Sequence, residues 1–170
     1  YNEQEEKDKI LILDWIRNNE NAFSRENTVA HMTASAWVVN KDRTKVLMVY
    51  HNIYSSWSWL GGHADGETDL LSVAVREVKE EAGLNVKAIR IIAIQDRNLH
   101  NIPPYAYNVC KVFVLCEIES GYFRPNIETD ESAYFGLEEL PILAKEKNNE
   151  EQIKMCFAAY YDRNWQVLFD

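Results

Sequence analysis

The sequence predicts a single α/β sandwich, in which helices pack against a mixed β-sheet. A chain of 170 residues suits one domain, with or without a helical extension. Short β-rich apolar runs alternate along it with two or three segments of helical periodicity, which is typical of layered α/β folds. No apolar stretch approaches the roughly 18 residues that a membrane helix needs, so the composition favours a soluble protein without a membrane partner.

The N-terminal part of the chain predicts a helix followed by a β-hairpin. Apolar residues with helical spacing predict a helix from about Glu5 to Asn18 that packs on the domain. After a polar linker, residues 32–40 and 45–50 have the composition of two strands joined by a turn. We therefore expect residues 1–27 to form an N-terminal helix and linker, and residues 28–170 to form the main domain.

A second helix and further strands are predicted beyond the hairpin. Apolar periodicity after residue 69 predicts a helix with Thr68 or Asp69 as its N-cap and Gly83 just past its end. Three β-rich runs follow, with a long loop containing Pro103-Pro104 between the first two. These runs are residues 89–94, 109–118 and 133–135. A C-terminal helix is expected at about residues 150–161.

Charge and cysteine content narrow the possible functions. A net charge of −9 argues against binding a nucleic-acid polymer, because such binding depends on clustered Lys and Arg. An acidic protein that acts on a small polyanion needs a cation between them, which points to a metal. The cysteines Cys110, Cys116 and Cys156 lie among apolar residues without metal-ligand spacing, so we expect buried, reduced thiols.

Three glutamates on the second predicted helix carry the strongest chemical signal. Glu77 and Glu81 are four residues apart and Glu80 is three from Glu77, so the carboxylates can share one side of the helix. A solvated acidic face, supported by the neighbouring basic residues, is one interpretation. A metal site is the other, because the preceding Gly61-Gly62 turn lets a backbone carbonyl approach a cation. Carboxylate, carbonyl and water oxygens suit Mg²⁺ or Mn²⁺.

Residues 62–84 resemble the Nudix box, G-x5-E-x7-R-E-U-x-E-E-x-G-U, in which U is an aliphatic residue. The segment has the length of this motif and matches every fixed position except the first glutamate, where Thr68 stands. Glu67, Asp69 or Thr68 as a helix cap could brace the loop instead. Residues 57–62 resemble the W-x-L-P-G-G strand and turn of the same family, with Leu60 where Pro is common. The resemblance implies a Nudix-type α/β/α sandwich with a mixed sheet.

The same resemblance assigns roles to residues of the box, with Mg²⁺ or Mn²⁺ as the cofactor. The implied metal ligands are glutamate carboxylates and one glycine carbonyl: Glu77, Glu80, Glu81, and Gly61 or Gly62. Glu80 is alternatively the catalytic residue that orients water. Arg76 would hold the helix carboxylates by a salt bridge.

Side chains outside the box are candidates for substrate binding and for the general base. Nudix enzymes often recruit another carboxylate, and Glu128 in a polar loop fits this role better than Glu117, which ends an apolar strand. Aromatic residues could stack a nucleobase, although core packing is their more common fate. Polar loop positions are the default expectation for the histidines, which could also contact phosphates. The candidates for substrate contact are Trp57, Trp59, Arg97, Tyr105, Tyr107, His51, His63 and His100.

The sequence also resembles particular Nudix subfamilies. Segments within residues 93–153 resemble ADP-ribose or CDP-choline pyrophosphatases, whereas residues 31–66 resemble a bacterial Nudix group of unassigned substrate. We therefore expect Mg²⁺-dependent hydrolysis of a phosphoanhydride in a small nucleoside diphosphate derivative. The alternative is a catalytically weak domain that binds a nucleotide derivative as a sensor. No signal-like segment is visible, so we expect a cytoplasmic protein. The resemblance and the aromatic N-terminal segment indicate a homodimer.

Overall fold

The computed structural model describes residues 2–170, and Tyr1, the first residue of the expected N-terminal extension, lies outside them. The helices are α1 (Glu3–Asn18), α2 (Leu70–Ala82), α3 (Arg97–His100) and α4 (Glu150–Tyr161), with a 3-10 turn η1 (Leu137–Glu139). The strands are β1 (Ala30–Val39), β2 (Val46–His51), β3 (Ser56–Ser58), β4 (Leu60–His63), β5 (Leu84–Asp96), β6 (Asn108–Gly121), β7 (Thr129–Phe135) and β8 (Leu168–Phe169).

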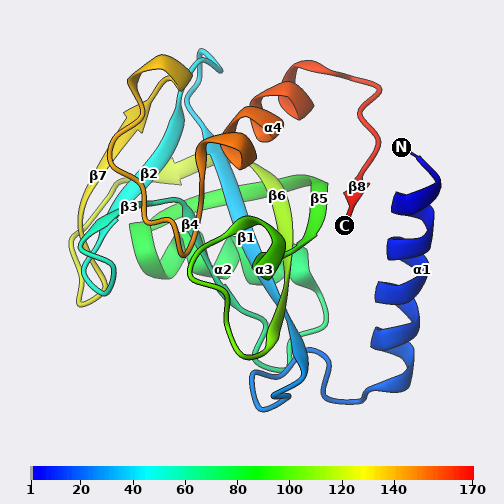
Figure 1. The fold of residues 1–170 in the computed structure, drawn as a ribbon. Helices are drawn as coiled ribbons and strands as arrows, with labels where there is room; N and C mark the ends of the chain where they lie inside the picture. Colours follow the sequence, from blue (N-terminus) through cyan, green and yellow to red (C-terminus); the bar gives the residue numbers. More distant parts are fainter. Residues whose placement is uncertain (1) are drawn as a thin grey trace.

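One mixed sheet organises these strands (Figure 1). Its main order is β3-β2-β1-β6-β5-β8, and β4 pairs with β1 while β7 pairs with β2. β1 and β6 run parallel, whereas β1 with β2 and β5 with β6 are antiparallel. The predicted hairpin is confirmed, because Val39 of β1 pairs with Val46 of β2 across the turn. The β1 and β6 pairing brings the two halves of the chain together at the centre of the sheet.

Helices cover both faces of the sheet, and the central strand β1 is therefore buried along almost its whole length. Its alternate residues from Met32 to Val38 join a cluster with the apolar side chains of α2. Trp37 belongs instead to a second cluster with α4, where its ring meets the edge of Phe157 at 4.8 Å between centroids. Successive side chains of a strand point to opposite faces, so α2 and α4 lie on opposite faces of the sheet. The predicted α/β/α sandwich is therefore confirmed.

Two strands are longer than the sequence predicts. β5 spans Leu84–Asp96 where residues 89–94 were expected, and β6 spans Asn108–Gly121 where residues 109–118 were expected, so the main extensions are at the start of β5 and the end of β6. In the first part of β5, buried Leu84 and Val86 alternate with exposed Asn85 and Lys87, and these residues still pair with β6. A run of apolar residues marks only the part of a strand buried on both faces, so the prediction was too short. The short β8 and α3 were also not predicted.

α1 stands at the β8 edge of the sheet, near the C-terminus (Figure 1). The Asn2 side chain accepts hydrogen bonds from the backbone N–H groups of Gln4 and Glu5, so the helix begins two residues earlier than predicted. None of its residues is fully buried, and Leu11 is 70% exposed. Among residues 2–170, no helix is long and apolar enough to cross a membrane.

The three cysteines are free thiols. Cys116 and Cys156 are buried as expected, whereas Cys110 is only partly buried. Burial raises the pKa of all three thiols, so they stay protonated at neutral pH. The cysteines are therefore packing residues of the sheet and of α4.

Candidate functional site: an acidic helix facing a basic and aromatic pocket wall

The loop before α2 is braced by the acidic residues on either side of Thr68. Asp69 is the N-cap, and its side chain accepts hydrogen bonds from the backbone N–H groups of Leu71 and Ser72. Glu67 Oε1 accepts a hydrogen bond from the Asp69 N–H at 2.9 Å. Of the two predicted caps, Asp69 is therefore the one used. The loop is held without a glutamate at position 68.

Gly62 provides the space in which the Glu77 carboxylate lies. In β4, Gly62 pairs with Ala34 of β1, so its backbone is fixed against the centre of the sheet. A Cβ atom on Gly62 would lie 2.4 Å from Oε2 of Glu77. Only glycine leaves this side of the strand open, and α2 packs close enough to use the space. The strand and the helix therefore fix one carboxylate of the box against the backbone of β4, so Gly61 and Gly62 lie in a strand and not in the expected turn.

Arg76, for which the resemblance implies a salt bridge to the helix carboxylates, lies on the other side of Glu77. Its guanidinium donates to Oε1 of Glu77 at 2.9 Å and to the His63 carbonyl at 3.0 Å. Burial raises the pKa of Glu77, and the nearby Glu81 and Glu80 add to this effect, whereas Arg76 opposes it. The charge of Glu77 is therefore only partly compensated by the protein.

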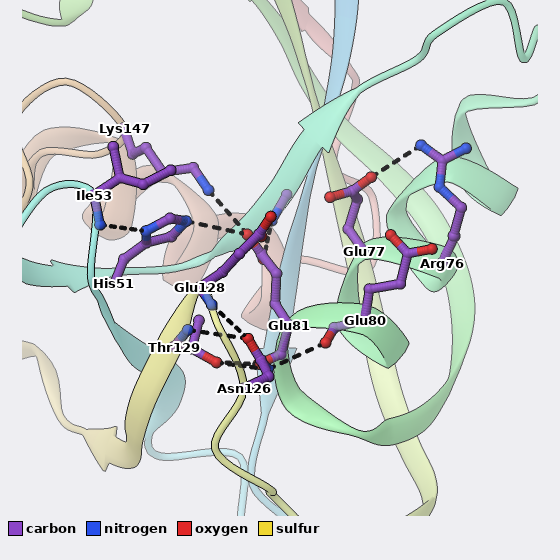
Figure 2. A network of polar contacts seen from close by, with 11 residues as sticks. His51, Ile53, Arg76, Glu77, Glu80, Glu81, Asn126, Glu128, Thr129 and Lys147 are labelled. Atoms are coloured by element: carbon purple, nitrogen blue, oxygen red, sulfur yellow. Dashed lines mark hydrogen bonds and ion pairs between the residues drawn. The ribbon is translucent and has the colours of Figure 1, made fainter.

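Glu81 is the buried centre of the acidic cluster, with 3% of its side chain exposed (Figure 2). Its Oε2 accepts a hydrogen bond from the Gly61 N–H at 2.8 Å. Its Oε1 lies 3.2 Å from Nζ of Lys147 and 3.6 Å from Nε2 of His51. Burial alone would raise the pKa of Glu81, but Lys147, His51 and the Gly61 N–H together hold it below its usual value. Glu81 is therefore an ionised carboxylate in the protein interior.

The loop between β6 and β7 attaches to the end of α2 and brings Glu128 to the site (Figure 2). The Asn126 side chain donates to the carbonyls of Glu80 and Glu81 at 3.2 and 3.1 Å. The Thr129 hydroxyl donates to the Glu81 carbonyl at 2.6 Å. As a result, potential ligand atoms of His51, Glu81 and Glu128 lie within 4.8 Å of one another. The exposed Glu128 thus stands beside the box.

A cavity of about 600 Å³ opens over this cluster. All the box residues expected to bind metal line it: Gly61, Gly62, Glu77, Glu80 and Glu81. Basic and aromatic residues from other segments also line it: Arg25, Arg97, Lys111, Lys147, Tyr54, Trp59 and Tyr105. One cavity therefore combines carboxylates with cations and ring surfaces, which suits a ligand that has both anionic groups and a heterocycle.

Two of the expected substrate contacts, Arg97 and Tyr105, line this cavity together. The Arg97 guanidinium carbon lies 3.3 Å from the centroid of the Tyr105 ring, and one of its N–H groups donates to the Pro103 carbonyl at 2.7 Å. The short helix α3 and the following loop hold this stacked pair on the cavity wall. Trp59 also lines the cavity, although its side chain is almost fully buried.

Trp57 and His100 lie elsewhere, which corrects their expected place in the substrate site. The Trp57 ring packs against Phe135 at 5.0 Å between centroids and does not line the cavity. His100 Nε2 lies 2.6 Å from a carboxylate oxygen of Asp170, so it fastens the C-terminal segment. Each side chain therefore contacts another residue of the protein, Phe135 for Trp57 and Asp170 for His100, where a ligand was expected. Core packing is the common fate of an aromatic residue near a strand end.

The structure also shows where Glu117 and His51 lie. Glu117, the less favoured candidate base, forms an ion pair with Arg43 at 3.4 Å and does not line the cavity. His51, expected in a polar loop, instead ends β2 and is 3% exposed. The sequence does not indicate the burial of His51, because a histidine near a turn carries no local signal for it.

The sequence does not single out two lysines that line the cavity, Lys111 and Lys147. Lys111 is buried in β6, and its Nζ donates to Asn101 Oδ1 at 3.1 Å and to the Lys147 carbonyl. Burial holds the pKa of Lys111 well below its usual value. A single lysine within an apolar strand was the available signal for it. Lys147 lies in a polar segment, and only the fold brings it to Glu81.

The donor set of the box fits Mg²⁺ or Mn²⁺. Three glutamates and the backbone of two adjacent glycines line one side of the cavity, and oxygen ligands of this kind are those that both ions prefer. The open space beside Gly62 and the raised pKa of Glu77 show a carboxylate placed where further positive charge would stabilise it. The arrangement is therefore consistent with the metal ligands expected from the sequence.

Comparisons with known proteins identify the family. The NUDIX domain model matches residues 29–156, so the chain belongs to the NUDIX family. It is 29% identical over 126 residues to "Putative ADP-ribose pyrophosphatase YjhB" of Bacillus subtilis, a match that covers 74% of this chain and 61% of that protein. The chain spans less than two thirds of the length of the curated relatives it matches.

Solved structures show the same fold. The structure of an ADP-ribose pyrophosphatase from Streptococcus suis is 39% identical, with a TM-score of 0.73, and the match covers 82% of this chain and 98% of that one. The structure of a UDP-X diphosphatase superposes with a TM-score of 0.75 at 22% identity, covering 94% of this chain and 74% of that one. The second similarity supports the fold alone.

Proposed function

We propose that this protein is a Mg²⁺- or Mn²⁺-dependent Nudix pyrophosphohydrolase. Its substrate would be a nucleoside diphosphate linked to a second moiety, such as ADP-ribose or CDP-choline. The observation that carries this proposal is that box glutamates and basic and aromatic residues from other segments line one and the same cavity of about 600 Å³. A solvated acidic face would not need glycines, a buried carboxylate and cations arranged around it.

In this proposal the box residues hold the metal and fix its surroundings. Glu77, Glu80 and Glu81, with a carbonyl of Gly61 or Gly62, would be the ligands. The bound ion would neutralise the charge of the pyrophosphate and favour in-line attack by water. Arg76 would keep the Glu77 carboxylate against Gly62 of β4.

The two exposed carboxylates near the cluster are candidates for the residue that takes a proton from the attacking water. Glu80 and Glu128 both line the cavity and are accessible to solvent. A general base must lie within hydrogen-bonding reach of the water, and both side chains are long enough to adjust their position. Hydrolysis would release a nucleoside monophosphate and a phosphorylated partner.

Cavity residues outside the acidic cluster support an extended substrate. The stacked Arg97 and Tyr105 pair offers a ring face and positive charge at one place, and Trp59 and Lys111 line the same cavity. Such a lining suits a substrate with groups on both sides of the pyrophosphate. The Bacillus relative is named a putative ADP-ribose pyrophosphatase and the Streptococcus protein an ADP-ribose pyrophosphatase, which supports ADP-ribose as a first substrate to test.

A substrate panel tests the proposal. We would measure kcat/KM with Mg²⁺ for ADP-ribose, CDP-choline, diadenosine polyphosphates and nucleoside triphosphates, because this ratio reports discrimination between competing substrates. We expect ADP-ribose or CDP-choline to lead. A triphosphate that led by about tenfold or more, roughly 1.4 kcal/mol, would overturn the substrate class but not the chemistry. Binding of these compounds without any turnover would instead favour the alternative function as a sensor.

The homodimer and the cytoplasmic location stay predictions. The exposed apolar residues of α1, among them Ile10 and Leu11, offer a surface that a second copy could cover. Size-exclusion chromatography with light scattering would decide the oligomeric state. A monomer at all accessible concentrations would contradict the expected dimer.

A further inference from the structure

Both oxygens of the Glu81 carboxylate already have protein partners. Gly61 N–H donates to Oε2 at 2.8 Å, and the Lys147 ammonium lies 3.2 Å from Oε1, with His51 3.6 Å from the same oxygen. By contrast, the Glu77 carboxylate has Arg76 as the donor to Oε1 while its Oε2 lies against Gly62, and the Glu80 side chain is exposed. A metal bound at Oε1 of Glu81 would therefore share this oxygen with the Lys147 ammonium.

The Lys147 ammonium is held in this position by its own segment of the chain. The Lys147 N–H donates to the Ala144 carbonyl at 2.9 Å, and Ala144 N–H donates to the Trp57 carbonyl at 2.8 Å. The Lys147 carbonyl accepts a hydrogen bond from the buried Lys111, which also donates to Asn101. The backbone at Lys147 is thus fixed on both sides, and its side chain is only 16% exposed. Its contact with Glu81 is a built feature of the fold.

We propose that Lys147 competes with the divalent cation for Glu81 and thereby sets the metal concentration that the site requires. This inference rests on the proposed function in taking Glu81 as a metal ligand. An ammonium group and a divalent ion repel each other strongly at the effective dielectric of a partly buried site. Metal binding therefore requires the ammonium to leave Oε1 while the backbone of the segment stays in place. The flexible four-carbon side chain of lysine allows this movement.

The displaced ammonium remains inside the cavity. The Lys147 Nζ already lies 5.8 Å from the centroid of the Tyr54 ring, and both residues line the cavity wall. An anionic group of a ligand is the natural next partner for it. Lys147 is therefore a positioning residue that exchanges one anionic partner for another when the metal binds.

Manganese titration without substrate tests this proposal. Free Mn²⁺ is measured by electron paramagnetic resonance with the full chain, for wild type and for Lys147→Met, Lys147→Gln and Lys147→Arg. Lys145→Met is the matched control, since it removes the same charge from an exposed side chain of the same segment. We expect the Mn²⁺ Kd to fall by at least about tenfold in Lys147→Met and Lys147→Gln. Lys147→Arg and Lys145→Met should stay within about twofold of wild type.

Each alternative result is decisive. An unchanged or higher Kd in both neutral variants, with thermal unfolding showing that they are folded, would overturn the proposal. Equal tightening in Lys147→Arg or Lys145→Met would also overturn it, because charge at this position would not be the cause. If wild type bound no Mn²⁺, a gain of binding in the neutral variants would support competition, and no binding in any variant would refute it. Because no turnover is measured, failure of the proposed hydrolysis would be seen separately in the substrate panel.

Discussion

Replacing Gly62 with alanine should disrupt the placement of Glu77 while leaving the fold intact. Gly62 has no positive φ, so alanine can adopt its backbone conformation without strain. The new Cβ would lie 2.4 Å from Oε2 and 2.7 Å from Cδ of Glu77, whereas ordinary contacts begin near 3.4 Å. The carboxylate must therefore move by about 1 Å. Its side chain is flexible, so the movement costs little stability.

A displacement of this size at a catalytic group typically lowers the rate by about 100-fold. We therefore expect kcat of Gly62→Ala to fall by about two orders of magnitude, with a change in unfolding free energy within about 1 kcal/mol. The assay is kcat at saturating Mg²⁺ and substrate, paired with thermal unfolding of the same preparation. Gly136→Ala is the control, because its Cβ would make no contact closer than 3.8 Å.

Two results would refute this reasoning. If Gly62→Ala turned over substrate within about twofold of wild type, the position of the Glu77 carboxylate would not matter to the reaction. If the variant lost several kcal/mol of stability together with its activity, backbone packing against β1 would be the cause instead. For comparison, Gly61→Ala should be strongly destabilising, since its Cβ would lie 2.4 Å from the Ala34 carbonyl oxygen and its φ is +150°.

Three further predictions concern the box. Glu77→Gln and Glu81→Gln should each lower kcat by at least about 100-fold, as removal of one electrostatic element of a site does, and near-normal steady-state turnover in both would contradict the metal assignment. Turnover should be absent in EDTA and return with Mg²⁺ or Mn²⁺, whereas metal-independent hydrolysis would rule out the mechanism. Thr68→Glu should change kcat/KM less than about threefold, because Glu67 and Asp69 already brace the loop. A large gain would show that the natural box is impaired.

The sequence predicted the fold and the box well because both follow from local patterns. The periodicity that placed α2 also placed its three glutamates on one side. The packing of α2 on β4 brings Gly61 and Gly62 next to Glu81 and Glu77, and these glycines lie in a strand where a turn was expected. Strand ends were harder to predict, because exposed residues such as Lys87 still pair within β5. The local pattern of apolar residues does not show how far a strand continues once its side chains become exposed.

The cavity wall could be predicted only in part, because its residues come from segments far apart in sequence. Arg97 and Tyr105 belong to one loop, so they were found together. Lys147 reaches Glu81 across 66 residues of chain, and no pattern near it indicates this contact. Trp57 and His100 were expected to contact the substrate but do not line the cavity. The sequence alone does not distinguish a side chain that binds a ligand from one that contacts another part of the protein. The assignment of residues 1–27 as a separate extension stays a prediction.

The position of the acidic residues within α2 has a consequence for the stability of the protein. All three glutamates lie in the second half of the helix, and Glu80 and Glu81 lie in its last turn at the negative end of the macrodipole, while its first turn has no acidic residue. Each exposed or partly exposed charge so placed typically costs about 0.3–1 kcal/mol, and Asn126 and Thr129 offset part of this by bonding the last carbonyls. A bound cation would offset the remaining unfavourable interaction of these carboxylates with the helix end. Because it binds only the folded protein, it would raise the free energy of unfolding by about 2.7 kcal/mol at a concentration of a hundred times its Kd. Metal concentration would then govern how firmly the end of α2 is folded as well as how fast the site works.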